Sequence, residues 1–166
     1  RMEAYRSRAK NLGPRTIALL PQTQGLEAQT TAHHMSEALA RFGSCLVVAK
    51  AQGQDRDSAW FAQMEALHRF VIYVAEPEED DWRELCRRQA DALIFLAASD
   101  ATVFAWSELI RGVGAPLPRP EHLVIVHKRR VPFGDAKKWQ SKRPRAMLHH
   151  LRDAKDAARL ARLTVG

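Results

Sequence analysis

The residues with the most suggestive chemistry lie in one short stretch, PQTQGLEAQTT at residues 21–31, between an apolar run and a helical pattern. In α/β folds the first junction of strand and helix is where backbone N–H groups and a helix N-terminus meet a phosphate. A working phosphate loop needs several glycines, a lysine, and a serine or threonine for magnesium. This stretch has one glycine, and a glutamine stands at the lysine position. We therefore expect no cofactor. The candidate residues of this degenerate loop are Gln24, Gly25, Gln29, Thr30 and Thr31.

The other polar motifs predict neither a catalytic residue nor a metal site. No serine lies in a G-x-S-x-G context, where a hydrolase nucleophile would be expected. His33–His34 and His149–His150 are adjacent pairs, so on a helix their rings diverge and cannot chelate one metal with i, i+4 spacing. The acidic run at residues 76–81 is more typical of a solvated loop that leads into a helix than of a cation site.

The net charge of +7 is unevenly distributed along the chain. Residues 1–15 hold five Arg or Lys against one Glu, residues 16–126 hold nine against fifteen acidic residues, and residues 127–166 hold twelve against three. An acidic body disfavours specific nucleic-acid binding, which usually uses a basic face of the folded core. The densest basic segment is interpreted either as a solvated loop or as a contact with an anionic surface, such as lipid or an acidic partner domain. The candidate contacts are Lys128, Arg129, Arg130, Lys137, Lys138, Lys142, Arg143 and Arg145.

Length and composition indicate one globular domain. The chain has 166 residues, of which 46% are hydrophobic and 27% charged, close to globular averages. The longest apolar run, Ala92 to Ala98, is far shorter than the roughly 20 residues of a membrane-spanning helix. The N-terminus lacks the apolar stretch of a secretory signal, and the cysteines, Cys45 and Cys86, form no framework, so we expect a cytoplasmic location.

Five short apolar runs predict strands that are covered on both faces, because they are continuous rather than alternating. They are residues 16–20, 45–49, 70–75, 92–97 and 123–126. Helical patterns separate them, so the fold class expected is a three-layer α/β/α domain with a mostly parallel five-stranded sheet.

The helical segments carry recognisable boundary signals. Apolar residues from Ala28 to Phe42 form one stripe, with Gly43 at the expected C-cap. Asp57 or Ser58 is expected to cap the next helix, and Asp81 with Glu84 is expected to form a capping box. Two further helices are predicted, at residues 103–113 and 147–163, and residues 128–146 are predicted to be a basic loop.

The stretch from Ile17 to Val48 resembles the opening strand, loop, helix and second strand of the deviant-Walker ATPases, which belong to the P-loop NTPases. Gly25, Thr30 and Thr31 are in register, whereas Ala28 stands where that family has a glycine. The family's magnesium-associated Asp falls on Ala75. The resemblance implies a P-loop-like fold with a degenerate nucleotide loop, and it leaves open a stand-alone nucleotide-binding protein as the alternative function.

A more specific resemblance covers residues 15–166. The phrases that carry it are TIALLP at 16–21, WFAQ at 60–63, VIY at 71–73, CRRQAD at 86–91, HLVIVH at 122–127, HHLR at 149–152 and RLARL at 159–163. In this order and spacing the chain resembles the segment of neuropathy target esterase and its bacterial relatives that lies between the cyclic-nucleotide-binding domains and the patatin-like esterase domain.

This resemblance implies a non-catalytic regulatory or linker domain of a larger patatin-like (lyso)phospholipase, a serine esterase that acts at a membrane surface. Residues 1–14 would then be a linker from an upstream domain, residues 15–166 a single domain, and the helix at 147–163 would lead to the patatin domain. The implied partners are the flanking domains of the same polypeptide and an anionic membrane surface, with the chain cytoplasmic and peripheral to the membrane.

Overall fold

The computed structural model describes residues 13–99, 119–127 and 136–166, and the fold is reported for these ranges. The helix predicted at residues 103–113 and the candidate contacts Lys128, Arg129 and Arg130 lie outside the described residues, as do residues 1–12 of the predicted linker.

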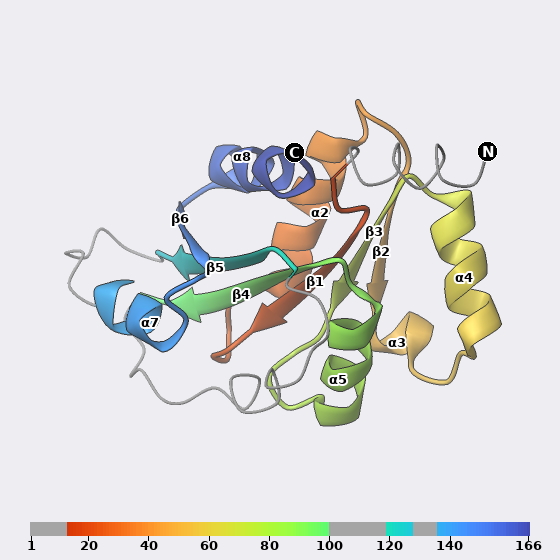
Figure 1. Ribbon diagram of the computed structural model, residues 1–166, viewed down its shortest axis with the longest axis horizontal. Helices are drawn as coiled ribbons and strands as arrows, with labels where there is room; N and C mark the ends of the chain where they lie inside the picture. The colour runs from red at the N-terminus through yellow and green to blue at the C-terminus, as the bar shows by residue number, and fades with distance from the viewer. Residues whose placement is uncertain (1–12, 100–118, 128–135) are drawn as a thin grey trace.

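Strands and helices alternate along most of the chain (Figure 1). The strands are β1 (Thr16–Pro21), β2 (Cys45–Ala49), β3 (Phe70–Val74), β4 (Ala92–Ala98), β5 (Glu121–Val126) and β6 (Met147–Leu151). The helices are α2 (Ala28–Leu39), α3 (Lys50–Gly53), α4 (Ser58–Leu67), α5 (Asp80–Gln89), α7 (Ala136–Lys142) and α8 (Ala154–Val165).

The strands form one parallel sheet in the order β2-β3-β1-β4-β5-β6. Strand β1 is central and pairs with both β3 and β4. Its side chains are buried on both faces because helices cover each side, which explains its continuous apolar sequence. The three-layer α/β/α class expected from the sequence is confirmed, with one strand more than the five predicted.

The two helical layers pack against opposite faces of the sheet. Ile17 and Leu19 of β1 pack with Met35 of α2 and Leu160 of α8. The alternate residues of β1 belong to a second apolar cluster that holds Phe61 of α4, Trp82 of α5 and Trp139 of α7. Figure 1 shows α2 and α8 together on one side of the sheet, with α5 and α7 on the other.

The structure corrects two predictions, the bounds of the terminal helix and the loop at residues 128–146. Residues 147–151 form β6 and pair with β5, and the terminal helix begins only at Ala154. Asp153 caps that helix, since its Oδ1 accepts a hydrogen bond from the backbone N–H of Asp156 at 3.0 Å. The predicted basic loop at 128–146 contains a helix, α7, and its Trp139 is fully buried against the sheet.

Other boundary signals had mixed outcomes. Asp57 caps α4 as predicted, with Oδ1 accepting from the backbone N–H of Trp60 at 2.9 Å. The capping box at Asp81 and Glu84 was wrong, because α5 already begins at Asp80. The apolar stripe of α2 was one turn too long, since the helix ends at Leu39 and Phe42 is 53% exposed. Gly43 is therefore not the C-cap of α2. Glycine is required at this position because a Cβ would lie 2.5 Å from Cβ of Arg69.

The first and last parts of the described chain are neighbours. Gly13 has a φ of 71°, and a Cβ at this position would lie 2.1 Å from the carbonyl oxygen of Val165 in α8. The backbone entering β1 therefore passes directly against the end of α8. Within the described ranges, no helix combines the length and apolar character needed to cross a membrane.

Candidate functional site

The carboxyl ends of β1, β5 and β6 lie at one edge of the sheet, where parallel α/β folds place their ligand sites. A cleft of about 220 Å³ opens there, between the start of α2 and the start of α8. Its polar lining includes Glu27, Thr30, Thr31, His127, Arg152 and Asp153. This is the position that a phosphate loop after β1 would face, so we take the cleft as the candidate functional site.

The structure brings together three of the five predicted loop residues. Gly25, Thr30 and Thr31 line the cleft. Gln24 is directed elsewhere, because its Nε2 donates a hydrogen bond to Oε2 of Glu78 at 3.0 Å. Gln29, at the position of the missing lysine, is exposed and does not line the cleft.

The loop before α2 uses two left-handed residues to turn into the helix. Gly25 has a φ of 73°, which glycine adopts without strain. Glu27 has a φ of 51°, a conformation that costs a residue with a side chain about 1 kcal/mol or more. Its side chain makes no cap, so the first turn of α2 has no side-chain partner for its N–H groups at this position.

At the start of α8, two acidic side chains already accept hydrogen bonds from backbone N–H groups. Asp153 caps the helix, and Oδ2 of Asp156 accepts from the backbone N–H of Arg152 at 3.0 Å. The cleft lining thus holds two carboxylates, Glu27 and Asp153, with Arg152 as the only Arg or Lys among its described lining residues. Among the described lining residues a triphosphate would meet these carboxylates with Arg152 but no lysine to offset them, and this arrangement disfavours nucleotide phosphates.

Burial, followed by the charges of His150 and Arg152, lowers the pKa of His127, which also lines the cleft. His127 therefore favours its neutral form and adds little positive charge at neutral pH.

Beneath the loop lies an arginine that the sequence analysis did not identify. Arg83 of α5 is 8% exposed, and its Nη1 donates to the carbonyl oxygens of Pro21 at 2.7 Å and Ala75 at 3.2 Å. It thereby joins the carboxyl ends of β1 and β3. In the resemblance to the deviant-Walker ATPases, Ala75 stands at the position of the magnesium-associated Asp. Here its carbonyl oxygen accepts a hydrogen bond from Arg83. Helical spacing could have indicated that Arg83 is buried, because it lies three residues before the buried Cys86 on α5.

Four histidines form two pairs across the last two strands: His122 lies on β5, His127 directly follows it, and His149 and His150 lie on β6. Nδ1 of His122 and Nε2 of His149 are 2.9 Å apart, and Nε2 of His127 and Nδ1 of His150 are 2.8 Å apart. His122 is 1% exposed, and its Nε2 has no hydrogen-bond partner among the described residues. Burial, followed by the charge of His149, lowers the pKa of His122 to about 4. Because His149 and His150 lie on a strand rather than a helix, they point to opposite faces of the sheet.

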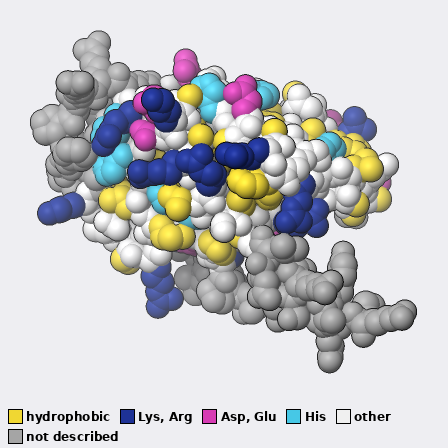
Figure 2. Space-filling view, turned by 90° about the horizontal axis from the view of Figure 1, so that it is seen from above, with side chains coloured by type: hydrophobic (Ala, Val, Ile, Leu, Met, Phe, Trp, Pro, Cys, Tyr) yellow, Lys and Arg dark blue, Asp and Glu magenta, His cyan; other side chains and the backbone are white. Residues whose placement is uncertain are grey.

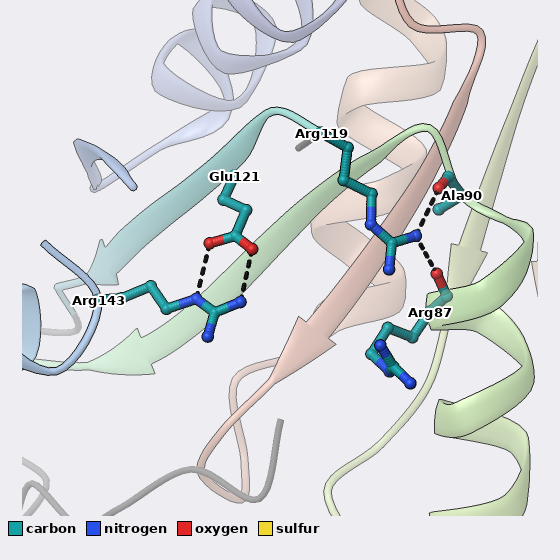
Figure 3. A network of polar contacts seen from close by, with 5 residues as sticks. All are labelled: Arg87, Ala90, Arg119, Glu121 and Arg143. Carbon is teal, nitrogen blue, oxygen red and sulfur yellow. Dashed lines mark hydrogen bonds and ion pairs between the residues drawn. The ribbon is translucent and has the colours of Figure 1, made fainter. Parts of the chain in front are cut away.

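Among the described basic candidates of the α7 region, Arg143 is already paired within the fold. Arg143 makes a bidentate ion pair with Glu121 at the start of β5 (Figure 3). Its guanidinium also lies 5.3 Å from the centre of the Phe95 ring. Nearby, Arg119 donates to the carbonyl oxygens of Arg87 and Ala90 at the end of α5. Arg143 therefore fastens α7 to the sheet and is not available to an anionic surface.

Two of the remaining candidates in this region, Lys137 and Arg145, have exposed side chains. The side chains of Lys138 and Lys142 lie outside the described residues.

Comparisons with known proteins place this fold in a family. The model of the neuropathy target esterase family P-loop-like domain matches residues 13–164. A solved structure of similar fold is a putative plasmid partition protein from Borrelia burgdorferi bound to AMPPNP, with a TM-score of 0.59 and 10% identity, covering 91% of this chain and 98% of that one. At this identity the likeness concerns the fold, and it agrees with the P-loop-like architecture expected from the sequence.

Curated relatives are much longer than this chain. Lysophospholipase NTE1 of Candida glabrata is 26% identical over 166 residues, which cover 89% of this chain and 10% of that protein. Patatin-like phospholipase domain-containing protein 7 of Rattus norvegicus is 25% identical over 131 residues, which cover 70% of this chain and 10% of that protein. The chain spans about a tenth of the length of these relatives. Because the family model covers nearly the whole described sequence, the chain belongs to the neuropathy target esterase family of P-loop-like domains.

Proposed function

We propose that this chain is a non-catalytic linker and regulatory domain of a larger serine lipid hydrolase of the neuropathy target esterase type. The observation that carries the proposal is the family match over residues 13–164, together with curated relatives, named as lysophospholipases, of which this chain corresponds to about a tenth. The proposed partners are the cyclic-nucleotide-binding and patatin domains of the same polypeptide, in the cytoplasm and peripheral to a membrane.

The geometry of the chain ends supports a linking role. Since Gly13 lies against Val165, polypeptide that precedes and follows the domain would leave it from neighbouring points. Two flanking domains attached in this way would lie close together, with this domain beside them as a rigid body. Small rotations between packed rigid bodies are a common means of transmitting a signal.

The cleft supports the non-catalytic part of the proposal. Its described lining pairs the hydroxyls of Thr30 and Thr31 with the carboxylates of Glu27 and Asp153, and lacks a lysine. Neither hydroxyl has the hydrogen-bonded histidine that would activate it as a nucleophile among the described residues. The alternative of a stand-alone nucleotide-binding protein gains no support from this charge arrangement.

Two measurements test the proposal. The reading frame around this sequence should encode a glycine-rich loop and a G-x-S-x-G motif downstream, and a stop codon directly after Gly166 would refute membership in a larger hydrolase. The purified 166-residue chain should not hydrolyse p-nitrophenyl butyrate or lysophosphatidylcholine, whereas the full-length protein should hydrolyse both. Turnover by the isolated chain that survives repurification would refute the non-catalytic assignment.

A further inference from the structure

Helix α8 presents a row of basic side chains that the sequence analysis did not single out. Arg152 lies two residues before the helix, ahead of the N-cap Asp153, and Lys155, Arg159 and Arg162 follow at steps of three and four residues. All four are exposed, and we call them the α8 basic ridge. Figure 2, which views the molecule from the side that carries α8, shows Lys and Arg side chains in a row across this face.

The ridge lies opposite the buried side of the helix. At about 100° per residue, the three basic residues on the helix, Lys155, Arg159 and Arg162, fall within an arc of about 60°. The buried residues Ala157, Leu160, Ala161 and Thr164 occupy the other side and pack into the domain. Asp156 falls outside the basic arc by the same geometry, and both Asp156 and the N-cap Asp153 accept backbone hydrogen bonds at the start of the helix. The outermost face of α8 is therefore basic without interspersed carboxylates.

These cations differ from other arginines of the domain in having no structural task. Arg83, Arg119 and Arg143 each bind backbone carbonyls or a carboxylate. Within the described part of the chain, none of the four ridge side chains makes a hydrogen bond or an ion pair. The helix holds three of them in a row, and all four side chains are exposed to solvent.

The sheet separates this ridge from the α7 region. Helix α8 packs on the face that carries α2, whereas Trp139 of α7 packs on the face that carries α5. A flat anionic surface therefore cannot contact the ridge and the exposed Lys137 through opposite faces at the same time. On the α7 side Arg143 is already paired with Glu121, whereas the ridge has all four cations available.

We propose that the α8 basic ridge docks the domain onto an anionic lipid surface. The helix lies along the outside of the domain, and Lys155 and Arg162 are about 10 Å apart along its axis, which matches a surface of mobile phosphate groups better than a pocket for one ligand. Leu163, 53% exposed beside the ridge, can enter the headgroup region, and α8 has no aromatic side chain on which a nucleic-acid base could stack. This inference rests on the proposed function, in which the parent protein acts on lipids.

The test is co-sedimentation of the 166-residue chain with vesicles of phosphatidylcholine, with and without phosphatidylserine, at low and high salt. We expect binding to the anionic vesicles alone, and its loss at high salt. The double variant Lys155→Glu with Arg159→Glu should weaken binding about thirtyfold or more, because each basic residue near an anionic surface contributes about fivefold. Both positions are exposed, so the fold should be preserved, as judged by circular dichroism and thermal unfolding.

The matched control is Lys137→Glu with Arg145→Glu, which changes the net charge equally on the α7 side and should weaken binding severalfold less. Equal weakening by the two double variants would overturn the assignment to α8, as would equal binding to neutral vesicles. Binding to polyglutamate without binding to anionic vesicles would instead indicate an acidic protein partner. The reading-frame test is independent of these outcomes, so failure of the docking surface can be told apart from failure of the proposed function.

Discussion

Acidification should destabilise this domain through the buried His122, with a further contribution from His149. His122 has its pKa lowered to about 4 in the folded protein, against about 6.5 in the unfolded chain. Above pH 6.5 both states leave the ring largely neutral. As the pH falls from 6.5 towards 4, the unfolded chain takes up a proton that the folded protein does not, so stability falls across this window and the loss is complete below pH 4.

The size of the effect follows from the two pKa values. Between pH 7 and pH 5 the linkage relation gives a loss of about 2 kcal/mol for His122 alone. Its partner His149 has a pKa that burial also lowers, so this second ring adds to the loss in the same direction. The ring of His122 is 1% exposed, and solvent screening therefore does not reduce this contribution appreciably.

Urea unfolding followed by tryptophan fluorescence at pH 7 and pH 5 measures the change. The variant His122→Gln should lose about 2 kcal/mol less than the wild type over this interval, whatever its stability at pH 7. The variant His33→Gln, at an exposed position, serves as the control and should follow the wild type. If wild type and His122→Gln lose stability in parallel, His122 does not resist protonation in the fold and the reasoning is wrong.

Three further predictions concern the cleft. Asp153→Ala removes the N-cap of α8 and should lower the free energy of unfolding by about 1 kcal/mol in urea, with an unchanged value as the contrary result. Glu27→Asn places a residue that tolerates the left-handed conformation at the start of α2 and should raise stability by about 0.5–1 kcal/mol, and a loss would contradict strain at this position. Calorimetric titration with magnesium and ATP at millimolar concentration should give no binding heat, because the described lining of the cleft holds Glu27 and Asp153 but no lysine, and micromolar affinity would reopen nucleotide binding.

Much of the layer structure could be predicted from the sequence because buried parallel strands leave a direct mark. The run at residues 92–97 is apolar throughout, and the run at 16–20 is apolar after Thr16. The sequence analysis did not predict the strand at 147–151. MLHHL is an edge strand with Met147 51% exposed, and its apolar residues continue at helical spacing into α8. The signal that separates the two elements is Asp153 with Asp156 three residues later, which marks a helix start.

The candidate site was only partly predictable, for a physical reason. A loop motif such as Thr30–Thr31 is local, and the structure does place it at the cleft. The contributions of α8 and of Arg83 come from residues far along the chain, which meet the loop only through the strand order. Likewise the ion pair of Arg143 with Glu121 depends on where α7 folds back, so charge density alone could not distinguish it from the exposed Arg145.

The central place of β1 has a consequence for how the domain acquires its structure during synthesis. The first strand to be made pairs on one side with β3 and on the other with β4, partners that begin more than fifty residues later. Such pairings are of high contact order, so the sheet cannot be nucleated by any early segment alone. Until β3 has left the ribosome, β1 remains an apolar segment without either neighbour, and chaperones that shield short hydrophobic strands should bind the nascent chain in this interval.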